Sequence, residues 1–193
     1  FHLEQILVSR GQNNRISACD FDSCCLGDPT TDLANFVSDL IIDKDGWLWI
    51  STHGAGVLRI KESELPATGS VLENLEQFNV GNQLADDYVM CLSETAAGDI
   101  WLGYWADGLG RFDRATKTFQ QFTHTVDYQL NLQEYPIVKL AEVKDTTGNF
   151  IWLGTRGGGV AKIKLTANQQ KVKLVKQYSY QGQEGNISNN FVC

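Results

Sequence analysis

The sequence predicts an all-β protein, a β-propeller built from four-stranded antiparallel blades, and three observations lead to this fold class. One motif occurs three times, at Trp49–Ile60, Trp101–Phe112 and Trp152–Ile163. Its first residues are 52 and 51 residues apart. The chain has only 3 Pro residues, and no helical period runs far. A Trp–Gly signature that repeats about every 50 residues is typical of propeller blades.

Each copy of the motif has the same internal pattern. Trp is followed by Ile or Leu, a Gly stands seven places on, and a Val or Leu and a basic residue follow. We expect the repeated Trp residues to pack between neighbouring blades. They are Trp49, Trp101 and Trp152. The repeated cations should bond to an adjacent blade rather than bind phosphate. They are Arg59, Arg111 and Lys162.

The flanks of the motif repeat as well, which predicts four strands per unit. An apolar inner strand comes first, then a Gly turn, the Trp strand, a Gly-rich bend, a third strand and an outer aromatic strand. The expected inner strands are Val37–Ile42, Val89–Leu92 and Ile137–Val143. The aromatics ahead of them are Phe36, Tyr88 and Tyr135, and those of the outer strands are Phe78, Phe119–Phe122 and Tyr178–Tyr180.

This pattern divides the chain into about three full blades and two partial ones. The predicted blades are 34–80, 81–126 and 127–180, preceded by 1–33 and followed by 181–193 as the start of the next blade. In the first segment, Leu3–Ser9 could be an outer strand of a preceding blade. Propellers need roughly 4–8 blades. We therefore expect an incomplete ring from a longer protein, with self-assembly of partial rings as the alternative.

Composition and charge exclude several classes of protein. With 42% hydrophobic residues the chain is not disordered, and 16 basic against 23 acidic residues give a net charge of −7. This balance argues against binding to nucleic acid or to an anionic membrane surface, since both need a basic face. No apolar run is long enough for a membrane span, and no signal peptide is visible.

Cysteine and histidine predict neither a metal site nor a cofactor. The 5 Cys residues form no CxxC pair, and His2, His53 and His124 have no metal-ligand spacing. A disulfide from Cys19 to Cys24 or Cys25 stays open at this point. The segment Asp43–Gly46 begins like a calcium loop but lacks the closing Glu, so it is interpreted as a turn.

The unit Asp-x-x-Gly-x-x-Trp-Ile/Leu-Gly/Ser-Thr-x-x-Gly-Gly-Val/Leu resembles the two-component regulator propeller repeat, and Gln181–Val192 resembles its connection into the next blade. The resemblance covers about Ala34 to Cys193, with departures at Tyr104, at Ala106 and in an insertion before Trp152. It implies the periplasmic sensor region of a membrane-anchored bacterial hybrid histidine kinase. Many such sensors detect carbohydrates, some precede diguanylate cyclases, and kinase signalling in the family is dimeric.

A ligand-binding site is expected on one face of the propeller. Strand order brings together the bends between second and third strands and the connectors that enter the next inner strand. The bends present a different residue at the same position in each copy: His53, Trp105 and Arg156. The connectors add Asp86, Asp87, Tyr88, Glu134, Tyr135, Asn189 and Asn190. Aromatic, amide and charged groups of this kind hold sugars, although loop tips also vary without function.

The sequence favours a non-enzymatic sensor over three rival classes. No Gly-x-Ser-x-Gly elbow or P-loop is present, so no catalytic residue is assigned. A glycan-cleaving propeller using Asp87 with Glu134 stays open as an alternative. The other two are a sensor of a diguanylate cyclase and a scaffold that docks proteins without a small ligand. The expected partners are an oligosaccharide and, through the full-length protein, a second copy of the chain.

Overall fold

A computed structural model describes residues 6–10, 16–20, 37–65, 75–180 and 189–192 of the 193-residue chain. Predictions made for Phe36, for the cysteines Cys24, Cys25 and Cys193, and for most of the linker Gln181–Val192 lie outside these residues, as does the question of a disulfide at Cys19. Among the described residues, no helix is long and apolar enough to cross a membrane.

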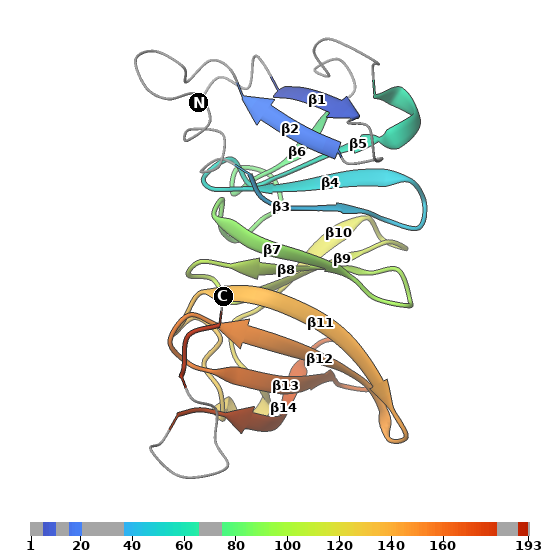
Figure 1. Cartoon of the computed structure of the whole chain (residues 1–193). Helices are drawn as coiled ribbons and strands as arrows, with labels where there is room; N and C mark the ends of the chain where they lie inside the picture. The colour runs from blue at the N-terminus through green and yellow to red at the C-terminus, as the bar shows by residue number, and fades with distance from the viewer. Residues whose placement is uncertain (1–5, 11–15, 21–36, 66–74, 181–188, 193) are drawn as a thin grey trace.

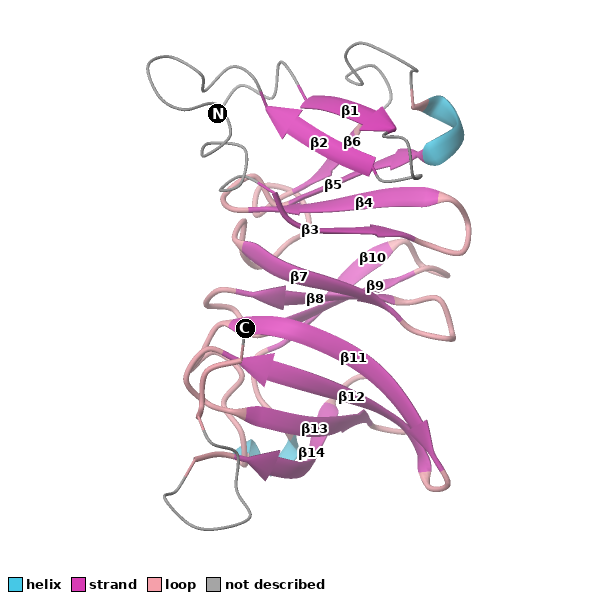
Figure 2. Ribbon diagram, viewed as in Figure 1, coloured by secondary structure: helices cyan, strands magenta, loops and turns pink. Residues whose placement is uncertain are grey.

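Three four-stranded antiparallel sheets confirm the predicted all-β propeller architecture (Figure 2). Within each sheet the strands are hydrogen-bonded in chain order. The first blade contains β3 (Val37–Ile42), β4 (Trp47–Thr52), β5 (Val57–Lys61) and β6 (Glu76–Phe78). The second contains β7 (Val89–Glu94), β8 (Ile100–Tyr104), β9 (Leu109–Asp113) and β10 (Thr118–Phe122). The third contains β11 (Ile137–Asp145), β12 (Gly148–Thr155), β13 (Val160–Leu165) and β14 (Val172–Tyr178).

Two further strands and two short 3₁₀ helices complete the described elements. The strands β1 (Ile6–Arg10) and β2 (Ile16–Asp20) pair as a separate antiparallel hairpin. The helix η1 (Glu62–Glu64) follows β5, and η3 (Val126–Tyr128) follows β10. The expected outer strand over Leu3–Ser9 therefore corresponds in part to β1, which pairs with the segment that follows it.

The blades stack side by side, as Figure 1 shows from the first blade to the third. The inner strand β7 packs between the inner strands β3 and β11, and the stack does not close into a ring. Each inner strand has a register shift at the same place, between Val37 and Asp39, Val89 and Cys91, and Ile137 and Lys139. The shift marks a β-bulge, which increases local twist.

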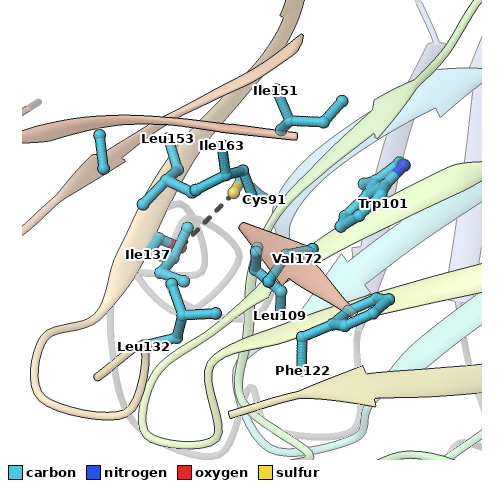
Figure 3. Packing of buried hydrophobic residues seen from close by; sticks show 11 residues of the cluster. Cys91, Trp101, Leu109, Phe122, Leu132, Ile137, Ile151, Leu153, Ile163 and Val172 are labelled. Carbon is cyan, nitrogen blue, oxygen red and sulfur yellow. Dashed lines mark hydrogen bonds between the residues drawn. The ribbon is translucent and has the colours of Figure 1, made fainter. Parts of the chain in front are cut away.

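The Trp strands supply the core between blades. Trp49 is 1% exposed and packs with Val89, Leu92 and Phe112 of the second blade. Trp101, also 1% exposed, packs in the same way with residues of the third blade, including Ile151 and Ile163 (Figure 3). The prediction that Trp49 and Trp101 pack between blades is therefore confirmed.

Each Trp also stacks on the aromatic residue of its own outer strand. The pairs are Trp49–Phe78, Trp101–Phe122 and Trp152–Tyr178, with ring centroids 6.1, 5.4 and 5.7 Å apart. For the Trp of the third pair, packing against a following blade stays a prediction. Trp152 is only half-buried, because no described blade covers its face of the third blade.

The repeated cations act within this inter-blade packing. Arg111 donates to Asp99 at 2.7 Å and to Gln169 of the third blade at 2.8 Å, which is the predicted bond to an adjacent blade. The Arg59 guanidinium lies 5.0 Å from the ring of Phe112 in the second blade. Lys162 instead pairs with Asp145 of its own blade at 2.8 Å.

The turns between the inner strands and the Trp strands lie at the end of the blades opposite the Gly-rich bends, and they add polar contacts. The Asp43–Gly46 segment is a turn, as predicted: Gly46 donates its N–H to the Asp43 carbonyl at 2.9 Å. The buried Asp43 carboxylate accepts from the indole Nε1 of Trp49 at 2.7 Å and pairs with Arg114 of the second blade at 2.9 Å. Arg114 also contacts Asp45 and Glu94. One carboxylate thus joins a turn, a core Trp and the next blade.

Candidate functional site

The predicted bends and connectors lie together on one face, and hydrogen bonds join them. We call it the bend face: the bends between second and third strands together with the connectors that lead into the next inner strand. The strands β8 and β12 both end at this face, on the left in Figure 1. His53 forms a bridge with Tyr88, and Arg156 forms one with Phe191, so each bend meets the connector of the following blade.

Two bends hold that connector through its main chain. The N–H groups of Gly54 and Gly56 donate to the Asp87 carbonyl at 3.0 and 2.9 Å. The N–H groups of Gly157 and Gly159 donate to the Asn190 carbonyl, both at 3.0 Å. We call this arrangement the carbonyl clasp. The repeated Gly has a separate cause: Gly56 has a φ of +76°, and a Cβ there would lie 2.0 Å from the Phe78 carbonyl oxygen.

The bend of the second blade departs from this arrangement. Between its residues 105–108 and the described connector 130–136, no carbonyl clasp forms. Ala106 instead donates its N–H to the Asp86 carboxylate at 3.1 Å, and Gln133 donates its amide to the Asp107 carboxylate at 3.1 Å. The Gln133–Asp107 bond thus joins this bend to the connector of the third blade through side chains, whereas the Ala106–Asp86 bond attaches it to the connector that precedes its own blade.

Two predicted residues meet at the boundary between the second and third blades. Trp105 is 41% exposed, and the Arg156 guanidinium lies 5.8 Å from its ring centroid. A guanidinium over an indole is a favourable cation–π arrangement. Arg156 comes from the next blade, where its backbone N–H is fixed by the Pro136 carbonyl at 2.9 Å. An indole and a guanidinium from two blades thus lie together at the surface.

A second predicted pair lies one blade boundary away. The rings of His53 and Tyr88 are 6.2 Å apart and tilted, and both side chains are exposed, Tyr88 by 51%. The Tyr88 ring lies over Gly54, where an added Cβ would be 3.6 Å away. This second aromatic surface belongs to the same face as Trp105.

The connector into the third blade places Tyr135 and Glu134. Tyr135 covers the bend glycines, since a Cβ at Gly157 or Gly158 would lie 2.8 or 2.5 Å from its ring. A hydrogen bond and the negative charge of Glu134 raise the pKa of the Tyr135 phenol. Pro136 takes the place that Tyr88 has in the preceding connector, so Tyr135 lies one position earlier.

Several predicted polar residues have structural partners. The Asp86 carboxylate accepts from Tyr88 N–H at 2.9 Å, and Asn189 does the same for Phe191 at 3.1 Å. Asp87 accepts from Val80 N–H at 2.8 Å, and the Asn190 side chain accepts from Tyr180 N–H. These groups shape the connectors, which leaves the aromatic and cationic side chains as the exposed chemistry. Phe191, 59% exposed, was missed although it aligns with Tyr88.

The departure at Tyr104 is matched by a second one at Gly110. Thr52 and Thr155 stand at the corresponding position in the other blades, and their hydroxyls donate to the Gly56 and Gly159 carbonyls at 2.8 and 2.9 Å. Tyr104 is 1% exposed, and a Cβ at Gly110 would lie 2.5 Å from its hydroxyl oxygen. Burial raises the pKa of this phenol. The Tyr104 ring therefore fits only because residue 110 is a glycine and has no side chain.

We expect Gly110→Ala to lower the free energy of unfolding by about 1–3 kcal/mol, because the new methyl group overpacks the Tyr104 ring. The double variant Tyr104→Thr with Gly110→Ala reproduces the pair Thr155 and Ala161 of the third blade. In urea denaturation, Gly110→Ala should cost less when it is added to Tyr104→Thr than when it is added to the parent chain. If the two changes are additive, the residues are not coupled.

The described residues contain no group of three or more His, Cys, Asp or Glu side chains that could hold a metal ion. Cys91 is buried against the Ile137 carbonyl (Figure 3), and burial raises the pKa of its thiol to about 12.

Comparisons with known proteins agree with this architecture. Residues 32–54 match the family model described as two component regulator propeller. The fold is similar to the extracellular domain of BT4673 from B. thetaiotaomicron, with 17% identity, a TM-score of 0.56, and coverage of 94% of this chain and 26% of that one. It is also similar to the extracellular domain of the hybrid two component system BT3049 from the same organism, with 16% identity, a TM-score of 0.52, and 94% and 25% covered.

The first part of the chain thus carries a two component regulator propeller repeat, which confirms the resemblance noted from the sequence. The chain spans about a quarter of the length of the solved structures it matches. No curated protein matches its sequence.

Proposed function

We propose that this chain is the ligand-sensing part of an extracytoplasmic receptor and that its bend face binds an oligosaccharide. Binding would be passed to a histidine kinase domain of the full-length protein, which would act as a dimer. The family match and the extracellular two-component domains with the same fold support the sensor role. This segment would recognise its ligand without converting it.

One observation carries the proposal: Trp105 lies outside the core clusters between the blades and is exposed beside the Arg156 guanidinium. The motif Trp residues Trp49 and Trp101 are 1% exposed, whereas Trp105 is 41% exposed. An exposed indole offers a flat apolar surface to the C–H face of a sugar, and the Arg156 guanidinium offers hydrogen-bond donors to its hydroxyl groups. Trp105 and Arg156 come from two blades, so the affinity for a ligand bound to both would depend on the relative position of these blades.

The test is calorimetric titration of a panel of oligosaccharides against the chain in its full-length protein. Trp105→Ala should weaken binding about thirtyfold or more, as expected when a stacked anchor is truncated. Trp105→Phe keeps an aromatic platform and should retain most of the affinity. Neither change should move the midpoint of thermal unfolding by more than a few degrees.

Equal affinities for the parent and Trp105→Ala would exclude the bend face as the site. If the parent binds no glycan, the oligosaccharide is the wrong ligand class and protein docking becomes the better explanation.

A further inference from the structure

A second surface, at the outer edge of the propeller, has the features of a binding site. A cavity of about 480 Å³ opens between the second and third blades, beside the outer strands β10 and β14. We call it the rim groove. It is lined by Gln121, Phe122, Thr123, His124, Thr125, Val126, Tyr128, Gln170 and Lys171. The rim groove uses the first part of the connector 123–136, and it shares no residue with the bend-face side chains Trp105, Tyr135 and Arg156.

Extra residues in one connector build the rim groove. The connector between β6 and β7 covers 79–88, whereas that between β10 and β11 covers 123–136 and is four residues longer. The longer connector folds back on itself through a bridge between His124 and Asn131. Thr125 fixes the loop, because its buried hydroxyl accepts from Leu130 N–H at 3.0 Å. It also forms a parallel bridge with Val172 of β14, so the loop is attached to the third blade.

This loop holds an aromatic pair open to solvent. The rings of His124 and Tyr128 stack with centroids 4.1 Å apart and planes 9° apart. Tyr128 is 79% exposed, so the ring face away from His124 is available. Its φ of +53° is unfavourable for an aromatic residue and costs about 1–3 kcal/mol. Apart from the contact with His124, Tyr128 buries little, so core packing does not account for its unfavourable φ.

The opposite wall is anchored and carries a positive charge. The turn between β13 and β14 is attached to the second blade, since Gln120 donates its amide to the Gln170 carbonyl at 3.1 Å. Next to it, the Lys171 ammonium has no hydrogen-bond or ion-pair partner among the described residues. The described side chains that line the rim groove, which do not include that of Asp127, carry no negative charge.

We propose that the rim groove binds a sugar acid, with the pyranose ring stacked on Tyr128 and the carboxylate paired with Lys171. An aromatic face suits the C–H side of a sugar ring, and an ammonium without a partner suits an anionic group. Gln121, Thr123 and Gln170 provide hydroxyl and amide groups for the sugar hydroxyls. This proposal stands independently of the one for the bend face.

The test is titration of the full chain, labelled with ¹⁵N, with glucuronate, glucose and inorganic sulfate. Glucuronate should shift the amide signals of residues 123–132 and 170–171 and bind at least tenfold more tightly than glucose. Lys171→Gln should weaken glucuronate binding about tenfold, because it removes a charge-assisted hydrogen bond, while Lys171→Arg should keep most of the affinity.

Two matched variants separate the site from general effects. Lys117→Gln removes an exposed cation outside the rim groove and should leave binding unchanged. Tyr128→Asn removes the ring but tolerates the positive φ, so it should weaken binding about tenfold without lowering the unfolding midpoint.

Four results would overturn the proposal. Glucose binding as tightly as glucuronate would remove the role of the carboxylate, and sulfate binding as tightly would remove that of the sugar. Equal losses in Lys117→Gln and Lys171→Gln, or shifts confined to Trp105, Tyr135 and Arg156 of the bend face, would exclude the rim groove as the site.

Discussion

Trp49→Ala is expected to lower the free energy of unfolding by about 3–5 kcal/mol. The side chain is 1% exposed and lies between two blades, stacked on Phe78 and 5.1 Å from the ring of Phe112. Truncation would remove this apolar contact area and leave a cavity that the surrounding strands cannot fill. It would also remove the hydrogen bond from the indole to Asp43. Urea denaturation monitored by circular dichroism measures the loss.

Trp152→Ala is the matched control, because Trp152 has the same motif position and the same stacking partner type but is half-buried. Its truncation removes less buried area and should cost clearly less than that of Trp49. Equal losses for the two variants would contradict the idea that contact with the next blade provides most of the stabilisation.

Asp43→Ala should lower the free energy of unfolding by about 3–5 kcal/mol, because it removes one partner of a buried ion pair. The side chain of Asp43 is 1% exposed at the ion pair with Arg114. Its Oδ1 accepts from the N–H groups of Asp45 and Trp47, both at 2.9 Å. Alanine would leave these donors and the Trp49 indole N–H without their acceptor.

Asp145→Ala provides the comparison within the same chain. Asp145 stands at the equivalent position of the third blade, where it accepts from Thr147 and Lys162, but it is exposed. The pairing with Lys162 holds the pKa of its carboxyl well below the usual range. Exposed pairs contribute little, so the loss should stay below about 1 kcal/mol. A loss as large as that of Asp43→Ala would show that burial does not decide the effect.

The repeat made the architecture predictable. Three copies of one motif fix the strand order, the position of the Gly bend and the face to which Trp49 and Trp101 point, because the same local rules act in every blade. The bend face followed from strand order alone. The residues that vary within it, such as Trp105 and Arg156, stood out because all three copies differ at this position, whereas the motif Trp and the Gly seven places on do not vary.

Features that depend on neighbours could not be predicted in this way. Burial of Trp152 depends on what covers its blade, and the motif does not contain that information. The four-way role of the Asp43 carboxylate requires Arg114, which lies 71 positions away in the chain. The rim groove arises from the fold of a connector outside the motif, where periodicity gives no signal. The repeated β-bulge could not be predicted either, because it leaves the apolar pattern of the strand intact.

The carbonyl clasp has a consequence for how this protein can evolve. It recognises Asp87 and Asn190 only through their backbone oxygen atoms, so the attachment of one blade to the next does not depend on which side chain is present there. The same holds for the residue that follows, Tyr88 or Phe191, whose side chain is exposed. Substitutions of Tyr88 and Phe191 in particular can therefore accumulate without loss of blade pairing, since the side chains of Asp87 and Asn190 also shape their connectors. Such substitutions could change the ligand preference of the face while the blades stay attached to one another.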